Sequence, residues 1–285
     1  MQRDSIQCTI GIDLEGYIMN KTLGFIGCGN MGSAMMNGMI SSKVIDSNQL
    51  WVADHHEANF KKIESLKAHT TTDNKEVVKQ SDILVLSIKP YMYASVIAQV
   101  KDCFKKDVIV VAIAAGKTIA QLKEMCGNDI KIIRAMPNTP SMVQEGMSAI
   151  CTDSLVNQED IMNIMDIFTS FGKAEIVPEH LFDAVIAVSG SSPAYVYMFI
   201  EAMADAAVAQ GMPRSQAYTF ASQAILGSAK MVLETGMHPG VLKDHVCSPG
   251  GTTIDAVMKL EETGFRTSVM QAMSACAKKS KEMSK

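Results

Sequence analysis

The sequence lacks the features that place a chain in a membrane or on nucleic acid. Its longest apolar run, Val108–Ala115, is far shorter than the ~18 residues that a membrane span requires. Its basic residues form no cluster apart from the tail Lys278–Lys285, whereas a nucleic-acid groove needs a concentrated positive surface. The first twenty residues carry charges such as Arg3 and Asp4 and no apolar core segment, so they do not resemble a secretory signal. We therefore expect a cytoplasmic protein with no membrane and no nucleic-acid partner.

A metal or redox cysteine pattern is also missing. No two of the seven cysteines are closer than twenty residues, whereas zinc and redox sites typically contain a C-x-x-C pair. We expect no metal site and interpret the cysteines as buried small apolar residues in a reducing compartment. What the chain does have is 285 residues, 47% of them hydrophobic, and a net charge of −4, which is typical of a globular protein with about two domains.

Residues 22–177 alternate short segments rich in Val, Ile and Leu with helix-length segments. Near-continuous apolar strands are typical of parallel sheets covered on both faces, and the alternation predicts an α/β fold with a doubly wound, Rossmann-type parallel sheet. The predicted strands are Leu23–Ile26, Leu50–Ala53, Ile83–Ile88, Val108–Ile113, Lys131–Arg134, Ser148–Thr152 and Ala174–Val177. The predicted helices between them include Met31–Ser41, Glu57–Leu66, Tyr91–Val100 and Gln158–Phe171.

Strand patterns disappear from Glu179 onward, where long segments rich in Ala and Met predict an all-helical domain. The expected helices are Pro193–Gln210, Arg214–Glu234, Thr252–Thr263 and Phe265–Glu282. Because these segments are apolar on more than one face, we expect a second chain to cover them in an obligate homodimer. The expected division is an N-terminal extension over residues 1–20, a dinucleotide-binding domain over 21–178, and a helical dimerisation and substrate domain over 179–285.

A G-x-G-x-x-G motif follows the first predicted strand and opens a helix, and its residues are Gly27, Cys28, Gly29, Asn30, Met31 and Gly32. In such a loop the first glycine allows the turn, the second lets the backbone approach a pyrophosphate, and the third lets helix and strand pack closely. The helix N-terminus adds N–H donors and a positive dipole end. The motif predicts a site for NADPH or NADH, with a glycine-rich structural turn as the alternative.

Asp54 and Asn74 are further candidates for cofactor contacts. An acidic residue at the end of the second strand binds a ribose hydroxyl and repels a 2′-phosphate, so Asp54 favours NAD. Its alternative role is the N-cap of the helix expected over Glu57–Leu66, and the two readings carry equal weight. Asn74 opens a helix, and we interpret it as a cap or a cofactor contact.

Two more loops leave the carboxyl ends of predicted strands, where open α/β sheets bind ligands. Ile88, Lys89 and Pro90 form one of them, and Ala115 lies in the other. A lysine beside a proline at a strand end favours a functional role over that of an ordinary surface residue.

A second glycine-rich loop, Ser248-Pro249-Gly250-Gly251-Thr252-Thr253, precedes an apolar helix. Small and hydroxyl residues at a helix start make a nest of backbone donors that suits a carboxylate. An ordinary helix start capped by Ser or Thr is the alternative.

Taken together, these segments resemble the pyrroline-5-carboxylate reductase family over residues 21 to about 280. The residues that carry the resemblance are Phe25–Gly32, Lys89-Pro90, Met136–Pro140, Ser189–Tyr195, His238–Gly240, Lys243-Asp244 and Ser248–Thr253. The resemblance implies a Rossmann domain followed by a helical domain that interleaves with that of a second chain, and dimers that assemble further. It also implies hydride transfer from NAD(P)H to the C=N bond of pyrroline-5-carboxylate, giving proline in the last step of its biosynthesis.

The same resemblance implies roles for individual residues. Gly250, Gly251, Thr252 and Thr253 hold the substrate carboxylate, and Thr253 lies beside the ring nitrogen. We assign Thr253 to orienting that nitrogen, and Ser248 to the catalytic loop with it. Glu179 contacts substrate, and Ile88, Lys89 and Ala115 line the nicotinamide side.

Three positions depart from the family pattern. Ser192 replaces a glycine, and His245 stands where some relatives carry asparagine. Asp54 stands where others carry serine or asparagine near the adenosine ribose, although Asn74 keeps a position that helps to bind the 2′-phosphate.

Two other functions share parts of this pattern. β-Hydroxyacid dehydrogenases and imine reductases begin with a similar glycine loop, but the glycine spacing around Lys230 is wrong for the hydroxyacid enzymes and Glu234 stands at their asparagine position. A nucleotide-sensing scaffold without turnover is the other alternative, and the intact second glycine loop argues against it.

Overall fold

The computed structural model describes residues 19–284, so residues 1–18 of the expected extension lie outside the described part. The chain forms two compact units. Among the described residues, the first unit comprises those up to Pro137 together with Ser141–Glu175, and the second comprises Asn138–Pro140 together with the residues from Ile176 to Ser284. Met19, placed in the extension by the sequence, is buried in the core of the first unit.

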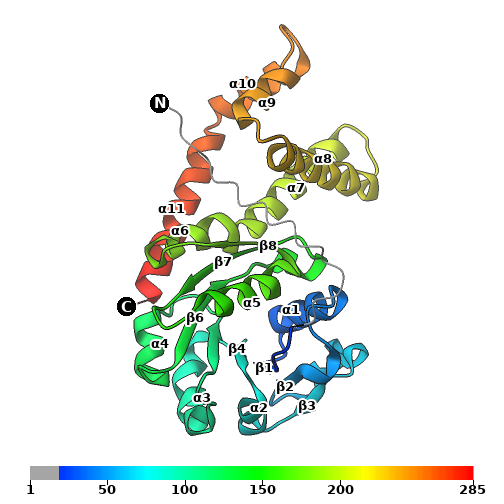
Figure 1. The fold of residues 1–285 in the computed structure, drawn as a ribbon. Helices are drawn as coiled ribbons and strands as arrows, with labels where there is room; N and C mark the ends of the chain where they lie inside the picture. Colours follow the sequence, from blue (N-terminus) through cyan, green and yellow to red (C-terminus); the bar gives the residue numbers. More distant parts are fainter. Residues whose placement is uncertain (1–18, 285) are drawn as a thin grey trace. The chain divides into compact units, whose positions relative to one another are not determined.

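An eight-stranded sheet forms the centre of the first unit, in the order β3-β2-β1-β4-β5-β6-β7-β8 (Figure 1). Its strands are β1 (Leu23–Ile26), β2 (Leu50–Ala53), β3 (His69–Thr71), β4 (Ile83–Leu86), β5 (Ile109–Ala112), β6 (Lys131–Met136), β7 (Gly146–Thr152) and β8 (Gly172–Ile176). The strands from β3 to β6 are parallel, which confirms the predicted doubly wound arrangement.

Two features of the sheet differ from the prediction. β7 runs antiparallel to β6, because the connection over residues 137–145 is shorter than the dozen or so residues that a parallel crossover needs. The sequence also missed β3, a short strand with exposed polar residues at the edge of the sheet.

Helices cover both faces of this sheet. They are α1 (Asn30–Ser41), α2 (Asn74–Gln80), α3 (Tyr93–Val100), α4 (Ile119–Cys126) and α5 (Gln158–Thr169). The α-helix predicted over Glu57–Leu66 is wrong, because the chain there forms two 3₁₀ segments interrupted at Ile63, whose side chain is buried and whose φ is −127°.

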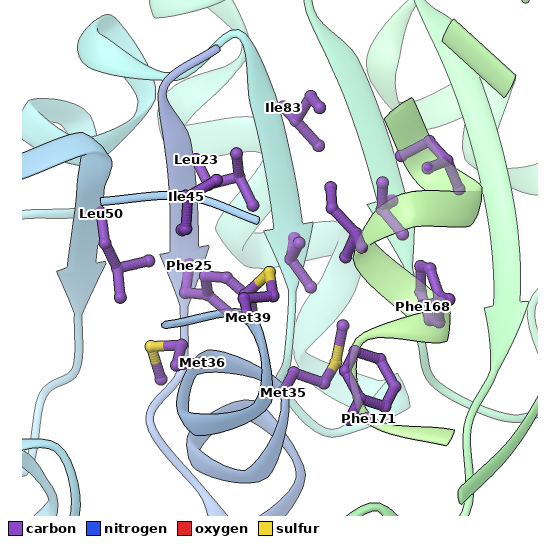
Figure 2. Packing of buried hydrophobic residues seen from close by; sticks show 14 of the residues in the cluster. Leu23, Phe25, Met35, Met36, Met39, Ile45, Leu50, Ile83, Phe168 and Phe171 are labelled. Carbon is purple, nitrogen blue, oxygen red and sulfur yellow. The ribbon is translucent and has the colours of Figure 1, made fainter. Parts of the chain in front are cut away.

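Alternate residues of the strands point into two apolar layers. On one face Leu23 and Phe25 pack with Met35, Met36 and Met39 of α1 and with the aromatic rings Phe168 and Phe171, as Figure 2 shows. On the other face residues such as Ile26 and Leu86 pack against α2, α3 and α4. Met35, Met36 and Met39 of α1 fill the core, which suits their flexible side chains.

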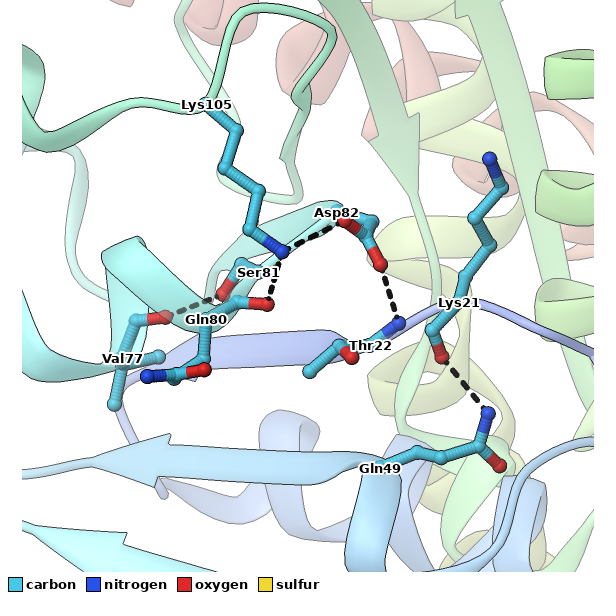
Figure 3. A network of polar contacts seen from close by, with 8 residues as sticks. All are labelled: Lys21, Thr22, Gln49, Val77, Gln80, Ser81, Asp82 and Lys105. Atoms are coloured by element: carbon cyan, nitrogen blue, oxygen red, sulfur yellow. Dashed lines mark hydrogen bonds and ion pairs between the residues drawn. The ribbon is translucent and has the colours of Figure 1, made fainter.

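A polar network fixes the amino ends of β1 and β4 (Figure 3). The Asp82 carboxylate accepts hydrogen bonds from the Thr22 backbone N–H and the Lys105 ammonium, each at 2.8 Å. Burial alone would raise the pKa of Asp82, but these donors and the positive charge of Lys105 lower it on balance. The charged carboxylate therefore helps to hold the amino ends of β1 and β4 together.

The second unit is helical. Its helices are α6 (Phe182–Val185), α7 (Ser192–Ala209), α8 (Arg214–Thr235), α9 (Pro239–Val246), α10 (Thr252–Glu262) and α11 (Phe265–Met283), with a π-helical turn over Ile186–Gly190. Ala217 and Ala221 are the only buried residues of the 22-residue α8, and α10 has none. Large side chains such as Phe220 and Leu233 are 66% and 65% exposed, so much of the apolar surface of these helices has no cover within the unit.

Within residues 19–284, every helix falls short of the length or the apolar character that crossing a membrane requires.

Candidate functional site

The three glycines of the first loop occupy three different environments. Gly27 has φ +101°, and a Cβ there would lie 2.3 Å from the Ser87 carbonyl oxygen. A Cβ on Gly32 would lie 2.8 Å from the carbonyl oxygen of Gly27. In contrast, a Cβ on Gly29 would meet nothing within 4 Å. The first and third glycines are thus required by packing, whereas the second faces open space from which a ligand can approach the backbone.

The start of α1 fits a negatively charged group. Its N-cap is Gly29, no side chain caps the helix, and its first turn contains no acidic residue. The first N–H groups of a helix have no intrahelical partner and lie at the positive end of its dipole. The residues present at Gly29, Asn30 and Met31 therefore suit the pyrophosphate of a dinucleotide.

Asp54 lies at the end of β2 and binds the glycine loop directly. Its carboxylate accepts hydrogen bonds from the Cys28 backbone N–H at 2.7 Å, the His56 backbone N–H at 2.8 Å and the Asn59 side-chain amide at 3.1 Å. The alternative that Asp54 caps a helix is wrong, because His56 is the N-cap residue of the 3₁₀ segment Glu57–Lys62.

The 3₁₀ segment adds two contacts to the glycine loop, and no local pattern in the sequence indicates either of them. The Cys28 thiol donates to the Asn59 carbonyl oxygen at 3.5 Å, and the Lys62 ammonium donates to the Asn30 side-chain oxygen at 3.1 Å. Burial and the negative charge of Asp54 raise the pKa of Cys28 to about 11, against the opposing charge of Lys62. Cys28 is therefore a protonated thiol at neutral pH.

Asn74 is the first residue of α2 and is buried. The expectation that it caps the helix is wrong, because the Asp73 carboxylate accepts the Lys75 backbone N–H at 2.8 Å and is the cap. A pocket of about 330 Å³ adjoins this turn and is lined by His55, Thr72, Asp73, Asn74, Lys75, Gln99 and Val100. Asn74 and the loop that follows β2 thus share one depression in the first unit.

The loop after β4 lies beside the glycine loop because β4 pairs with β1, and β5 pairs with the other side of β4. The Ser87 backbone N–H donates to the Ile26 carbonyl oxygen at 2.9 Å, and a Cβ on Gly27 would lie 3.0 Å from the Ile88 side chain. Lys89 precedes the 3₁₀ segment Pro90–Met92. Ala115 follows the end of β5. The first unit therefore places the predicted cofactor residues after the carboxyl ends of successive parallel strands of one sheet.

The second glycine loop forms a tight turn before α10. The Gly251 backbone N–H donates to the Ser248 carbonyl oxygen at 3.0 Å, and Gly250 has φ +66° with open space around its Cα. The alternative that Ser or Thr caps this helix is wrong, because the N-cap residue is Gly251 and no side chain caps the helix. α10 begins at Thr252, and Thr253 follows in its first turn. Its uncapped N–H groups suit a carboxylate, although Asp255 adds a negative charge to the first turn.

Glu179 is not brought to this loop within one chain. α6 follows Glu179 and packs against the carboxyl end of α11, where the Ser280 hydroxyl donates to the Asp183 carboxylate at 2.6 Å. The loop before α10 lies at the amino end of α10, and the carboxyl end of α10 leads into the amino end of α11 (Figure 1). A helix of 19 residues is about 28 Å long, so α11 separates α6 at its carboxyl end from α10 at its amino end.

The cysteines only partly match the expectation of burial. Cys28, Cys126 and Cys151 are buried, whereas Cys103, Cys247 and Cys276 are partly exposed. Cys8 lies outside the described residues. Within residues 19–284, no three side chains of His, Cys, Asp or Glu gather in a way that could hold a metal ion.

Comparison with known proteins identifies the family. Residues 179–283 match the family described as pyrroline-5-carboxylate reductase dimerisation, and residues 22–116 match the family described as NADP oxidoreductase, coenzyme F420-dependent. The pyrroline-5-carboxylate reductase of Escherichia coli strain K12 is 51% identical, over 94% of this chain and all of its own. The chain belongs to the pyrroline-5-carboxylate reductase family.

Other members of the pyrroline-5-carboxylate reductase family are similar to this chain over almost its whole length. The Methanosarcina acetivorans protein of that name is 42% identical over 93% of this chain and 99% of its own. The structure of pyrroline carboxylate reductase from Plasmodium falciparum with NADP bound covers 94% of this chain and all of its own, with a TM-score of 0.86 and 34% identity. An imine reductase and a 3-hydroxyisobutyrate dehydrogenase are only 18% and 11% identical, a level that shows the fold alone.

Proposed function

We propose that the chain is an NAD(P)H-dependent pyrroline-5-carboxylate reductase, which reduces the C=N bond of 1-pyrroline-5-carboxylate to give L-proline in the last step of proline biosynthesis. The observation that carries the proposal is the 51% identity to the Escherichia coli protein of that name, over 94% of this chain and the whole of that protein. The NADP-bound relative supports a nicotinamide dinucleotide as cofactor.

The cofactor is held by the first unit. The α1 N-terminus and the loop Gly27–Gly32 hold the pyrophosphate, while Asp54 and Asn74 act at the adenosine end. Ile88, Lys89, Pro90 and Ala115 line the nicotinamide side. When bound, the reduced nicotinamide supplies the hydride that the C=N carbon accepts, and the protein contributes orientation. The open space at Gly29 and the uncapped start of α1 support this assignment.

The substrate is held by the loop before α10. Gly250, Gly251 and Thr252 offer backbone donors to the substrate carboxylate, and Glu179 contributes a further contact. The Thr253 hydroxyl orients the ring nitrogen. A hydroxyl is itself a poor acid, so the proton that the nitrogen takes up comes from solvent water, and Thr253 relays it without a net loss of its own proton. Ser248 keeps the loop in shape: a Cβ on Gly251 would lie 2.4 Å from the Ser248 hydroxyl oxygen, so the two residues are in close contact.

The active protein is a homo-oligomer built from twofold dimers whose helical units interleave, and dimers assemble further. The exposed apolar side chains of α8 and α10 support this proposal, because a second copy is needed to bury them. The separation of Glu179 from the loop before α10 supports it too, since a partner's helices can bring the two features together. We assign residues 21–178 to the dinucleotide-binding domain and 179–285 to the dimerisation and substrate domain, and place the enzyme in the cytoplasm.

Cofactor oxidation tests the proposed function. Purified protein is incubated with NADPH or NADH and, separately, with pyrroline-5-carboxylate, a β-hydroxyacid, an unrelated cyclic imine or no substrate. We expect oxidation with pyrroline-5-carboxylate only. Higher activity with the other imine or turnover of the hydroxyacid would favour the related oxidoreductases, and binding of cofactor without any turnover would favour a nucleotide sensor.

A further inference from the structure

Tyr93, the first residue of α3, is fully buried yet keeps its hydroxyl in two hydrogen bonds to the main chain. The hydroxyl donates to the Leu86 carbonyl oxygen at 2.8 Å and accepts from the Ala114 backbone N–H at 3.3 Å. Leu86 is the last residue of β4, and Ala114 follows the end of β5. One side chain therefore joins the carboxyl ends of two neighbouring parallel strands, β4 and β5.

The first of these bonds closes a loop. Leu86 and Tyr93 are the two ends of the segment that contains Lys89 and Pro90, and the Met92 backbone N–H donates to the Lys89 carbonyl oxygen at 2.9 Å inside it. The second bond attaches this loop to the segment that contains Ala115. The position of both loops therefore depends on one hydroxyl.

The glycine loop is tied to the same assembly. Ser87 follows Leu86, and its carbonyl oxygen and hydroxyl lie where side chains on Gly27 and Gly32 would collide with them. A displacement of the β4 loop is thus transmitted to the pyrophosphate loop through close packing. The hydroxyl also supplies a hydrogen-bond partner to the Leu86 carbonyl oxygen and to the Ala114 N–H, because buried polar groups without a partner destabilise the fold.

We propose that Tyr93 is a positioning residue for the cofactor, whose hydroxyl holds the two nicotinamide-side loops at the ends of β4 and β5 in register with each other and with the glycine loop. The inference rests on the proposed function, which assigns Ile88, Lys89 and Ala115 to the nicotinamide side. Because Tyr93 is fully buried, it acts through these loops and not through contact with cofactor or substrate.

The test uses the full-length protein with Tyr93→Phe and Tyr93→Met, which remove the hydroxyl and keep an apolar side chain. Ser81→Ala is the matched control, because the Ser81 hydroxyl is also buried, donates to the Val77 carbonyl oxygen at 2.7 Å and lies at the amino end of β4. Each protein is characterised by thermal unfolding and steady-state kinetics. Its binding of NADPH and of 2′,5′-ADP, which contains only the adenosine end, is measured by calorimetry.

We expect both Tyr93 variants to lower kcat/KM for NADPH by about fivefold or more and to weaken NADPH binding, while the Kd of 2′,5′-ADP stays within about twofold of that of the wild type. Ser81→Ala should lower the melting temperature without changing the binding of NADPH or of 2′,5′-ADP. Kinetics within about twofold of the wild type, or equal weakening of NADPH and 2′,5′-ADP, would overturn the proposal. Failure of both variants to fold while Ser81→Ala folds would also overturn it, because the hydroxyl would then support the whole fold. Failure of the proposed function is distinguishable, since the wild type would then not turn over pyrroline-5-carboxylate.

Discussion

The backbone N–H of Cys28 donates a hydrogen bond to the carboxylate of Asp54 at 2.7 Å. This bond joins the middle of the glycine loop to the end of β2, and the same carboxylate accepts two further donors from His56 and Asn59. Asp54 therefore has two properties that bear on cofactor binding: it supports the loop, and it places a negative charge beside it.

The charge of Asp54 should set the cofactor preference. We expect the wild type to use NADH at least as well as NADPH, because a carboxylate repels a 2′-phosphate. Asp54→Ser should weaken the binding of both cofactors, because the glycine loop loses the carboxylate that accepts the Cys28 backbone N–H. It should also raise the ratio of kcat/KM for NADPH to that for NADH by roughly fivefold, since a unit charge in a solvated site contributes about 1 kcal/mol. Steady-state kinetics with each cofactor measure this ratio.

Asn59→Ala is the matched control for the charge. It removes the amide that donates to Asp54 at 3.1 Å and leaves the carboxylate in place. Both cofactors should bind more weakly while the ratio stays as in the wild type. An overwhelming preference of the wild type for NADPH, or a change of ratio in Asn59→Ala as large as in Asp54→Ser, would contradict the role of the charge.

Thr253 is expected to affect turnover and not cofactor affinity. Thr253→Ala removes the hydroxyl that we propose to orient the imine nitrogen, and the loss of one hydrogen bond corresponds to roughly 0.5–1.5 kcal/mol, or about two- to thirteenfold in kcat. Thr263→Ala, at the other end of α10, removes a hydroxyl that donates only within its helix and serves as the control. Equal rates for Thr253→Ala and the wild type would remove Thr253 from the site.

Assembly should depend on the exposed apolar side chains of α8. Leu233→Asp introduces a charge where a second chain is expected to pack, and we predict loss of the dimer together with activity, measured by light scattering and enzyme assay. Lys230→Ala on the same helix removes an exposed ion pair with Glu234 and should leave both unchanged. A stable, fully active wild-type species of 30.8 kDa, the mass of one chain, would disprove an obligate dimer.

The Asp82 carboxylate should make part of the free energy of unfolding depend on pH. Its pKa is lowered in the folded protein, so its contribution is present above the unfolded value of about 3.9 and is lost as the pH falls through the folded pKa. Asp82→Asn should therefore unfold at lower urea concentration than the wild type at pH 7, and the difference should shrink below about pH 4. Lys105→Met tests the contribution of the Lys105 ammonium, which forms an ion pair with Asp82. A difference between Asp82→Asn and the wild type that persists unchanged in acid would refute this account.

The sequence was informative where local chemistry decides the structure. The glycine loop, most of the strands and the long helices follow from spacing and apolar pattern, because close packing in a parallel sheet imposes both. The edge strand β3 was missed because its exposed residues His69 and Thr70 have no apolar alternation. The antiparallel direction of β7 depends on the length of a connection and is not visible in the strand itself.

The site was less predictable because its contacts are made between distant segments. Nothing local in Asp54 indicates that it binds Cys28, 26 positions earlier, or that Tyr93 bridges two strand ends. Caps were also misassigned by one position at Asn74, since Asp and Asn at adjacent positions are both good caps and only the backbone geometry selects Asp73.

Transfer of deuterium from the cofactor to the product distinguishes a reductase of this imine from a protein that only binds the two ligands. The purified protein is given pyrroline-5-carboxylate and NADPH or NADH carrying deuterium at both C4 positions of the nicotinamide, and the product is analysed by mass spectrometry. We expect proline with one deuterium on the ring carbon that was doubly bonded to nitrogen. Unlabelled proline, or no proline while the cofactor is bound, would contradict it.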